Sequence, residues 1–192
     1  MDLQELLKKR RSYRKFDEAR AISATDRDKI LRAVQSASSG NNRQTLRFIS
    51  VESPEMVAQV FDLTRWAASL PPELGQPKPG ERPVYFVAVL AHQKSTPFVD
   101  VDKGLAISNM TLTAMDMGIG SCIIGNFNHD ALRSLLNIED DYRCNLLVAF
   151  GYPAIQSSIK EIDIDEDPSY YLDEAGQYVV PKFKTEAIVR RV

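Results

Sequence analysis

The segment from Val84 to Ala91 (VYFVAVLA) is the longest uninterrupted apolar run in the chain. Its β-branched and aromatic residues predict a strand that is buried on both faces. Such a strand constrains the whole fold, because the rest of the chain must cover both faces of the sheet that contains it. The run is far shorter than the ~20 residues that span a bilayer, so it does not predict a membrane segment.

Capping residues and hydrophobic spacing predict the elements around this strand. Asp2 caps a short helix over residues 2–9, and Ser23 or Thr25 caps a second helix that ends in a polar turn. Helices and strands do not alternate regularly, so an α+β sandwich fits better than a doubly wound parallel fold. The remaining predicted elements are a strand over 47–52, helices over 54–63 and 101–117, a strand over 118–125, a helix after Asn128 and a strand over 146–150.

Two segments interrupt this pattern. Residues 71–83 contain five of the ten prolines, which cannot continue a helix or a central strand, so the segment from about 64 to 83 is expected to form a loop or lid. The tail from 163 to 192 has sparse periodicity and predicts an arm over another surface, such as that of a second subunit. The 192 residues otherwise predict a single domain over 1–192 with one core, crossed by the helix at 101–117.

Composition excludes several classes of function. A net charge of -2 and a pI of about 5.8 have the wrong sign for a general nucleic-acid binder. Two cysteines outside any CxxC pair and two histidines do not predict a metal site, and no GxSxG motif supports a Ser-His-Asp hydrolase. The N-terminus lacks the apolar region of a signal peptide, so we expect a soluble, cytoplasmic protein without a membrane partner.

A basic run, KKRRSYRK, occupies residues 8–15 and has three interpretations. Such a run is most often a solvated face, and a nucleic-acid patch is a second interpretation that the acidic remainder of the chain disfavours. The third is a phosphate site, because guanidinium groups bind phosphate oxygens through paired donors. Arg10, Ser12 and Arg14 alternate along the chain, so an extended backbone would project all three to one side.

Two further segments combine small and polar residues. The turn over 38–44 (SSGNNRQ) is typical of a helix end with Gly40 or Asn41 in the left-handed region, although Asn42 and Gln44 also offer amides that could bind a heteroaromatic ring. The segment GIGSCIIG at 118–125 is not a dinucleotide fingerprint, since it reads GxGxxxxG and precedes a strand. Its glycines favour close approach of the backbone to a packed helix or a flat ligand.

Taken together, these motifs resemble the FMN-dependent nitroreductase family, and they occur in that family's order. RRSYRKF is similar to the family's RRSxRxF phosphate motif. SSGNNRQTLRFISV is similar to its PSxxNxQPxxF turn and strand, and GIGSCIIGNF is similar to its GLGSCWIGxF segment. The segment 65–83 and the late VPKFK are similar to pieces found in one branch of the family.

This resemblance implies an α+β fold with a mixed sheet sandwiched by helices, in an intertwined homodimer with two FMN sites at the interface. FMN would carry the chemistry, so no catalytic side chain is expected, and Arg14 would support the reduced flavin. The implied cofactor-binding residues are Arg10, Arg11, Ser12 and Arg14 from one subunit and Ser38, Ser39, Gly40 and Asn42 from the other, with Gln44 near the ring. Ile124 and Gly125 would offer backbone groups to the flavin edge, and Lys182 and Lys184 would reach the phosphate.

The function that the resemblance implies is an oxidoreductase in which NADH or NADPH reduces FMN and leaves before an electron-poor nitroaromatic or quinone takes its place. This exchange predicts ping-pong kinetics. Ser38, Thr45 and Ile123 depart from the family's usual residues, so the pocket wall is unusual and the acceptor stays open. Trp66 is expected either to cover the substrate as part of the lid or to pack in the core.

Alternative functions remain at this point. On the same fold, they are reductive dehalogenation and flavin-consuming synthesis. Outside enzymes, they are non-catalytic binding of flavin or a phosphate ligand and nucleic-acid contact through the basic run.

Overall fold

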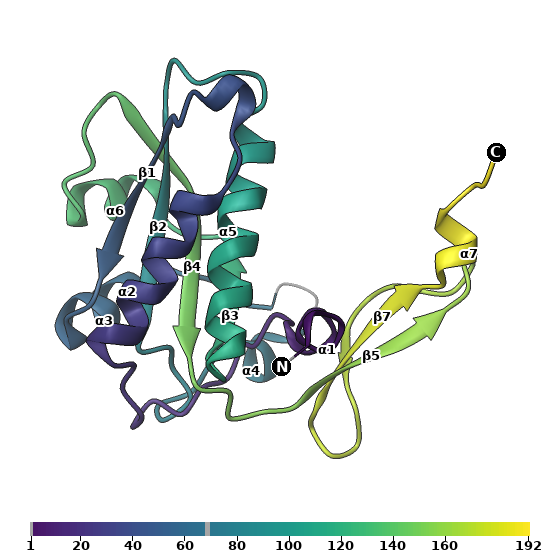
Figure 1. The fold of residues 1–192 in the computed structure, drawn as a ribbon. Helices are drawn as coiled ribbons and strands as arrows, with labels where there is room; N and C mark the ends of the chain where they lie inside the picture. The colour runs from purple at the N-terminus through teal and green to yellow at the C-terminus, as the bar shows by residue number, and fades with distance from the viewer. Residues whose placement is uncertain (1, 68–69) are drawn as a thin grey trace.

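The computed structural model describes residues 2–67 and 70–192, which form a four-stranded sheet with helices on both faces and an extended arm (Figure 1). The apolar run forms β2 (Tyr85–His92), in which every residue before His92 is buried. β2 pairs with β1 (Leu46–Val51) and β4 (Tyr142–Gly151), and β3 (Gly120–Ile124) completes the order β1-β2-β4-β3. The predicted buried strand is therefore confirmed, with both of its edges paired.

One face of the sheet is covered by α2 (Ala24–Arg32) and α5 (Val99–Asp116). Tyr85 and Val87 of β2 point to this face and pack with buried residues of the two helices, such as Met110. Because side chains alternate along a strand, the neighbours of Tyr85 and Val87 must enter a different core. The first face is therefore a separate hydrophobic layer.

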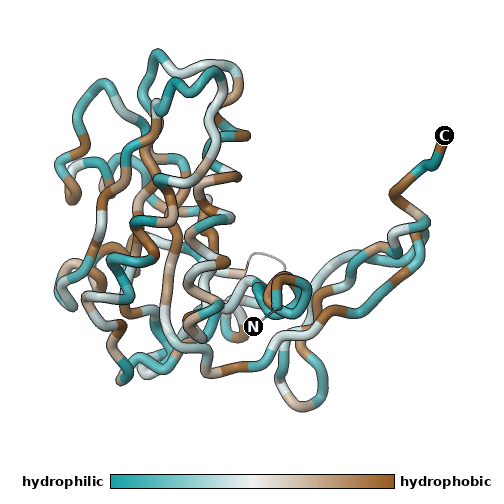
Figure 2. The backbone as a smooth tube through the Cα atoms, in the orientation of Figure 1, coloured by the Kyte–Doolittle hydropathy of each residue, from teal (hydrophilic) through white to brown (hydrophobic). Residues whose placement is uncertain are grey.

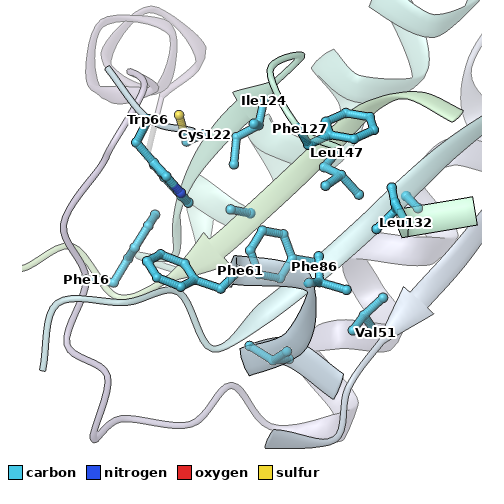
Figure 3. Close-up of a cluster of buried hydrophobic side chains, with 14 of the residues drawn as sticks. Phe16, Val51, Phe61, Trp66, Phe86, Cys122, Ile124, Phe127, Leu132 and Leu147 are labelled. Carbon is cyan, nitrogen blue, oxygen red and sulfur yellow. The ribbon is translucent and has the colours of Figure 1, made fainter. Parts of the chain in front are cut away.

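The opposite face is covered by α3 (Pro54–Asp62) and α6 (His129–Leu135). Phe86 of β2 belongs to this second cluster, together with Phe61 from α3 and Leu132 from α6 (Figure 3). The two clusters show why the sheet needs helices on both faces, as the buried strand predicts. Together they confirm a layered α+β fold.

Side-chain caps start the helices where the sequence predicts. Asp2 Oδ1 accepts a 2.8 Å hydrogen bond from the backbone N–H of Glu5 and so caps α1 (Leu3–Lys9). Ser23 rather than Thr25 caps α2, and Asn128 caps α6. These local bonds satisfy N–H groups that the first helical turn leaves without a partner. After α2 the chain continues as two 3-10 turns, η1 (Ala33–Ser36) and η2 (Gly40–Asn42).

Several expectations need correction. The strand pairs of the central sheet are all antiparallel, so this sheet is not mixed, although an isolated parallel bridge joins Ser12 to Ser121. The proline-rich segment contains a short helix, α4 (Pro72–Gly75), and residues 68–69 of the predicted lid lie outside the described residues. α5 is not enclosed on all sides, because Val101 and Leu105 are exposed on it.

The arm is a small three-stranded sheet that projects from the body (Figure 1). It begins before residue 163, because β5 belongs to it and pairs in parallel with β7. Hydrophobic and hydrophilic stretches alternate along the arm as far as the C-terminus (Figure 2). The elements of the arm are β5 (Ser157–Ile162), β6 (Tyr171–Leu172), β7 (Tyr178–Phe183) and α7 (Thr185–Ile188).

Across the described ranges, we find no helix with the length and apolarity needed to cross a membrane.

Candidate functional site

The basic segment leaves α1 as an extended chain that lies beside β3. The backbone N–H of Tyr13 donates to the carbonyl of Ser121 at 2.9 Å, and the Tyr13 ring is buried. Gly120 permits this approach, because a Cβ there would lie 2.9 Å from the Tyr13 ring and 2.8 Å from Pro153. Ser12, next to Tyr13, is exposed. The extended course expected for residues 10–14 is thus present, and Tyr13 anchors it.

Arg10 and Arg11 follow different courses from the end of α1. The guanidinium of Arg11 donates to the carbonyls of Leu7 and Lys8 and so caps the helix C-terminus. Burial, and next the charge of Arg10, lowers the pKa of Arg11. Arg10 Nε is buried and has no hydrogen-bond partner among the described residues. Arg10 therefore keeps a donor for a ligand, whereas Arg11 is engaged within its own helix.

Arg10 lines a hollow of about 370 Å³ that runs along α5 and reaches Ile123 of β3. Lys103 also lines this hollow; its amine is buried and pairs with Asp100 at 2.9 Å. Ser108 of α5 adds a hydroxyl. Two cations and a hydroxyl beside an apolar wall are groups that bind a phosphorylated aromatic ligand.

Arg14 stacks on two tyrosines of the arm. Its guanidinium carbon lies 4.1 Å from the ring centre of Tyr170 and 5.3 Å from that of Tyr178. Tyr178 is fully buried, its hydroxyl has no hydrogen-bond partner among the described residues, and burial raises its pKa. Cation–π contacts fix the guanidinium, and its Nη1 donates to the carbonyl of Ser12 at 3.3 Å. The arm therefore positions Arg14 within the same chain.

The polar turn over 38–44 adopts a backbone that few residues accept. Three residues of the turn lie in the left-handed region, with φ angles of 51° for Asn41, 53° for Asn42 and 49° for Gln44. The sequence predicted Gly40 or Asn41 in this region, and the structure has Asn41 there and not Gly40. Gly40 is required for space, since a Cβ there would lie 2.9 Å from the Cβ of Phe98. Left-handed non-glycine residues cost free energy and persist only where their surroundings hold them.

Asp102 holds this turn in place. It is almost fully buried on α5, and its Oδ1 accepts a 2.8 Å hydrogen bond from the backbone N–H of Gly40. A second bond joins the N–H of Gln44 to Ser39 Oγ at 3.2 Å. The other carboxylate oxygen of Asp102 is buried and has no partner among the described residues. Asp102 thus acts as a positioning residue beneath the turn.

Sequence reasoning missed Asp102 and Lys103. Both are charged residues in a segment predicted to run through the core. Charged residues are rarely buried without a partner, so their place in this segment was a signal that they have a specific role. Their partners could not be found locally, because Gly40 lies 62 positions from Asp102. The sequence also gave no indication that Tyr170 stacks on Arg14.

The two predicted halves of the site line different hollows of one chain. Ser38, Ser39 and Gln44 line a hollow of about 200 Å³ with Asp102. Arg10 lines the larger hollow on another part of α5. The turn and the basic segment are therefore not brought into a common hollow within the single chain.

The remaining predicted residues are dispersed. Ile124 is buried in the core, and Gly125 follows it at the exposed end of β3. Lys182 is exposed on the arm, whereas Lys184 forms bonds of 2.9 and 3.0 Å to the two oxygens of Asp163, which raise its pKa. Trp66 donates from Nε1 to Thr64 Oγ1 at 2.7 Å. Its ring packs against Phe16 and Phe61 (Figure 3).

The burial of Trp66 agrees with the core-packing alternative for this residue. The cysteines do not supply reactive thiols, because burial raises the pKa of Cys122 and of Cys144 to about 11. Among the described residues there is no cluster of three or more His, Cys, Asp or Glu side chains that could hold a metal ion.

Fold and site together define the class of protein: an α+β domain with a helix-covered antiparallel sheet, whose basic segment runs along a glycine-bearing strand. Comparison with known proteins gives the family. The model of the nitroreductase family matches residues 7–152, so this chain belongs to the nitroreductase family. The match spans nearly all of the body, and the arm lies beyond it.

Relatives agree with this membership. An Archaeoglobus fulgidus protein whose assigned name joins NADH dehydrogenase and NAD(P)H nitroreductase is 30% identical over 162 residues, covering 80% of this chain and 87% of the relative. An NADPH-dependent oxidoreductase from Staphylococcus epidermidis is 29% identical over 71% of this chain, which spans 59% of that relative's length.

Solved structures confirm the fold. A nitroreductase family protein from Clostridium novyi has a TM-score of 0.67 and 26% identity, covering 80% of this chain and 86% of that one. A nitroreductase with bound FMN from Bacteroides fragilis has a TM-score of 0.63 and 24% identity, covering 80% and 89% of the two chains.

Proposed function

We propose that this protein is an FMN-dependent oxidoreductase that takes hydride from NADH or NADPH and passes it to an electron-poor acceptor such as a nitroaromatic or a quinone. The observation that carries the proposal is the buried, unpartnered Nε of Arg10 in a hollow along α5, within a chain of the nitroreductase family. The names of the relatives support NAD(P)H as donor, and two similar structures are named for FMN.

The residues present fit FMN. Its phosphate is a dianion, and the hollow offers it the Arg10 guanidinium next to the Lys103 amine, which is paired with Asp100. Arg14 is held beside the same strand, and its N–H groups that do not bind Ser12 would contact the pyrimidine end of the ring. When bound, FMN supplies the hydride transfer. Gly125 adds an open backbone, because a Cβ there would meet nothing closer than 3.7 Å.

The turn over 38–44 is proposed to complete the site on a second copy of the chain. Within one chain, the turn and Arg10 line different hollows, so a single copy does not bring the two sets together. Exposed Val101 and Leu105 on α5 give a second copy an apolar surface to cover. A homodimer with paired sites follows, and Asp102 would orient the turn of each copy toward its neighbour's site.

The chain's residues would place donor and acceptor in turn over the same face of the site. The Cys122 thiol, with its pKa raised to about 11 by burial, stays neutral at physiological pH and so does not act as a nucleophile. Sequential use of one site predicts parallel double-reciprocal lines in steady-state kinetics. Intersecting lines would contradict successive binding of donor and acceptor at one site.

The direct test is the visible spectrum of the purified full-length protein, followed by anaerobic addition of NADH or NADPH. We expect a flavin band that bleaches, and release of FMN on denaturation. Turnover without loss of FMN would exclude flavin-consuming synthesis. A protein that is colourless and fails to bind added FMN would refute the proposal and favour a phosphate-ligand or nucleic-acid role for the basic segment.

Variants test the residue assignment. Arg10→Ala and Arg14→Ala should each weaken FMN binding at least tenfold, because each removes a charge-assisted donor. Arg14→Ala should also lower the flavin reduction potential, since its cation favours the more negative reduced form. Arg32→Ala, on the exposed end of α2, is the matched control and should bind FMN as the wild type does. Unchanged FMN titrations for both site variants would show that the phosphate segment is misassigned.

A further inference from the structure

A third hollow, of about 420 Å³, lies at the other end of β1 from the polar turn. Gln44 precedes β1, and Glu52, which lines this hollow, follows it. Six strand residues at about 3.3 Å each separate the two by roughly 20 Å. None of the residues proposed to bind FMN lines this hollow. Its volume falls in the range of about 300–1,000 Å³ that small-molecule sites occupy.

The wall of the hollow is mainly apolar. Phe61 and Val57 of α3 are buried at its inner side, and Ile22 closes it from the segment before α2. Ala58 of α3 is exposed and lines the hollow with its methyl group. A ligand of this hollow must therefore carry an apolar body.

Four charged residues line the hollow, and three of them are engaged. Arg27 pairs with Glu52 at 3.2 Å and donates to the carbonyl of Ile22 at 2.8 Å. Glu18 accepts hydrogen bonds from the backbone N–H groups of Gly80, at 2.6 Å, and Arg82, at 3.3 Å. These contacts stabilise the rim and engage three of its four charged side chains.

The remaining charge is the guanidinium of Arg82. It forms neither a hydrogen bond nor an ion pair with any described residue, and its Nε is buried. Its carbon lies 4.9 Å from the ring centre of Phe61, so an aromatic floor and a fixed backbone hold the group in place. A partly buried arginine fork without a carboxylate is a ready binding group for one.

We propose that this hollow binds a small organic monocarboxylate with a flat or aliphatic apolar body, at a site separate from the flavin. The carboxylate pairs with Arg82, and the body packs on Val57, Phe61 and Ile22. A single charge fits better than a phosphate dianion, because one cation is free and two glutamates line the same space. Such a ligand would bridge α3 to the end of the proline-rich segment.

Calorimetric titration of the full-length, flavin-loaded protein with benzoate tests the proposal, with benzyl alcohol as the neutral analogue. Benzoate should bind without moving the visible flavin band, and benzyl alcohol should bind at least tenfold more weakly. Arg82→Gln should weaken benzoate at least tenfold, and Arg82→Lys should recover part of this loss because it keeps the charge but not the fork. Lys78→Gln removes an exposed charge from the same segment and should change nothing.

A second variant avoids dependence on Arg82. Ala58→Leu should fill the hollow from an exposed helix position and exclude benzoate while leaving the melting temperature close to that of the wild type. The proposal is overturned if wild-type protein does not bind benzoate, if benzyl alcohol binds equally well, or if benzoate shifts the flavin band and still binds the Ala58→Leu variant. If the protein bound no FMN, the proposed function would be refuted. The benzoate titration of that FMN-free protein would still test whether this hollow binds a carboxylate.

Discussion

The body and the arm of this protein obtain their stability in different ways. In the body, β2 and the second half of β4 are buried on both faces, each covered by helices of the same chain. In the arm, β5 is buried at Ile162 and mostly exposed before it. Ile159, Ile164 and Ile188 are exposed on the arm. The body therefore buries its apolar residues in its own core, whereas the arm exposes apolar side chains on its surface.

A matched pair of core and arm variants sharpens this comparison most strongly. Phe150→Ala should cost about 3–5 kcal/mol of unfolding free energy, because the ring is fully buried. Ile159→Ala should cost less than about 1 kcal/mol in dilute protein, because its side chain is exposed there. Urea unfolding measures both, and sedimentation should show weaker self-association for Ile159→Ala alone. Equal unfolding losses for the two variants would contradict the distinction.

The hydrogen bond from the Gly40 N–H to Asp102 should maintain the conformation of the turn over 38–44. Asp102→Ala removes the acceptor for the Gly40 N–H and should weaken FMN binding at least tenfold, because the left-handed turn relaxes. Asp102→Asn keeps an acceptor oxygen and should recover most of the affinity. FMN titration, with urea unfolding run in parallel, separates loss of the turn from loss of the fold. An Asn variant as weak as the Ala variant would refute positioning by this hydrogen bond.

The body should also lose stability at high pH through its two cysteines. The pKa of each cysteine rises from 9.0 to about 11 on folding, so the folded state binds more protons between these values. The thiols' contribution is complete below pH 9 and declines as pH rises toward 11, by on the order of 1 kcal/mol per cysteine between pH 9 and 10. The Cys122→Ala/Cys144→Ala double variant should show a shallower decline in urea unfolding. Parallel pH profiles would contradict the assignment.

The smallest effect is expected where the arm meets the body. Tyr178→Phe removes a buried hydroxyl that has no partner among the described residues, so FMN-free protein should be unchanged or up to about 1 kcal/mol more stable. Retained stacking on Arg14 should leave FMN affinity within about twofold of the wild type. A loss above 1 kcal/mol in urea unfolding would show that a second copy or a water satisfies this hydroxyl.

Sequence patterns predicted the body well because its signals are local. Asp2, Ser23 and Asn128 cap helices within three residues, and the run at 84–91 needs no distant information to become a buried strand. The arm strands were not predicted, since β5 is exposed over most of its length and β7 does not alternate strictly between buried and exposed residues.

The site shows the same division. The extended basic segment follows from its own alternation and from the glycine of β3 that admits Tyr13. Asp102 and Tyr170 act across long sequence separations, so their contacts with Gly40 and Arg14 could not be predicted from neighbouring residues. Trp66 illustrates a further limit, because a tryptophan beside a proline-rich segment suits both a lid and a core.

The proposed function requires that two copies build each flavin site, one giving Arg10 and Arg14 and the other giving the turn over 38–44. Co-expression of an Arg10→Ala/Arg14→Ala chain with an Asn42→Ala/Gln44→Ala chain, under separate affinity tags, tests it directly. Each homodimer should fail to bind FMN, and the doubly purified heterodimer should regain one intact site, about half the wild-type capacity. A heterodimer that binds no FMN, while wild-type protein with the same tags does, would contradict the shared site.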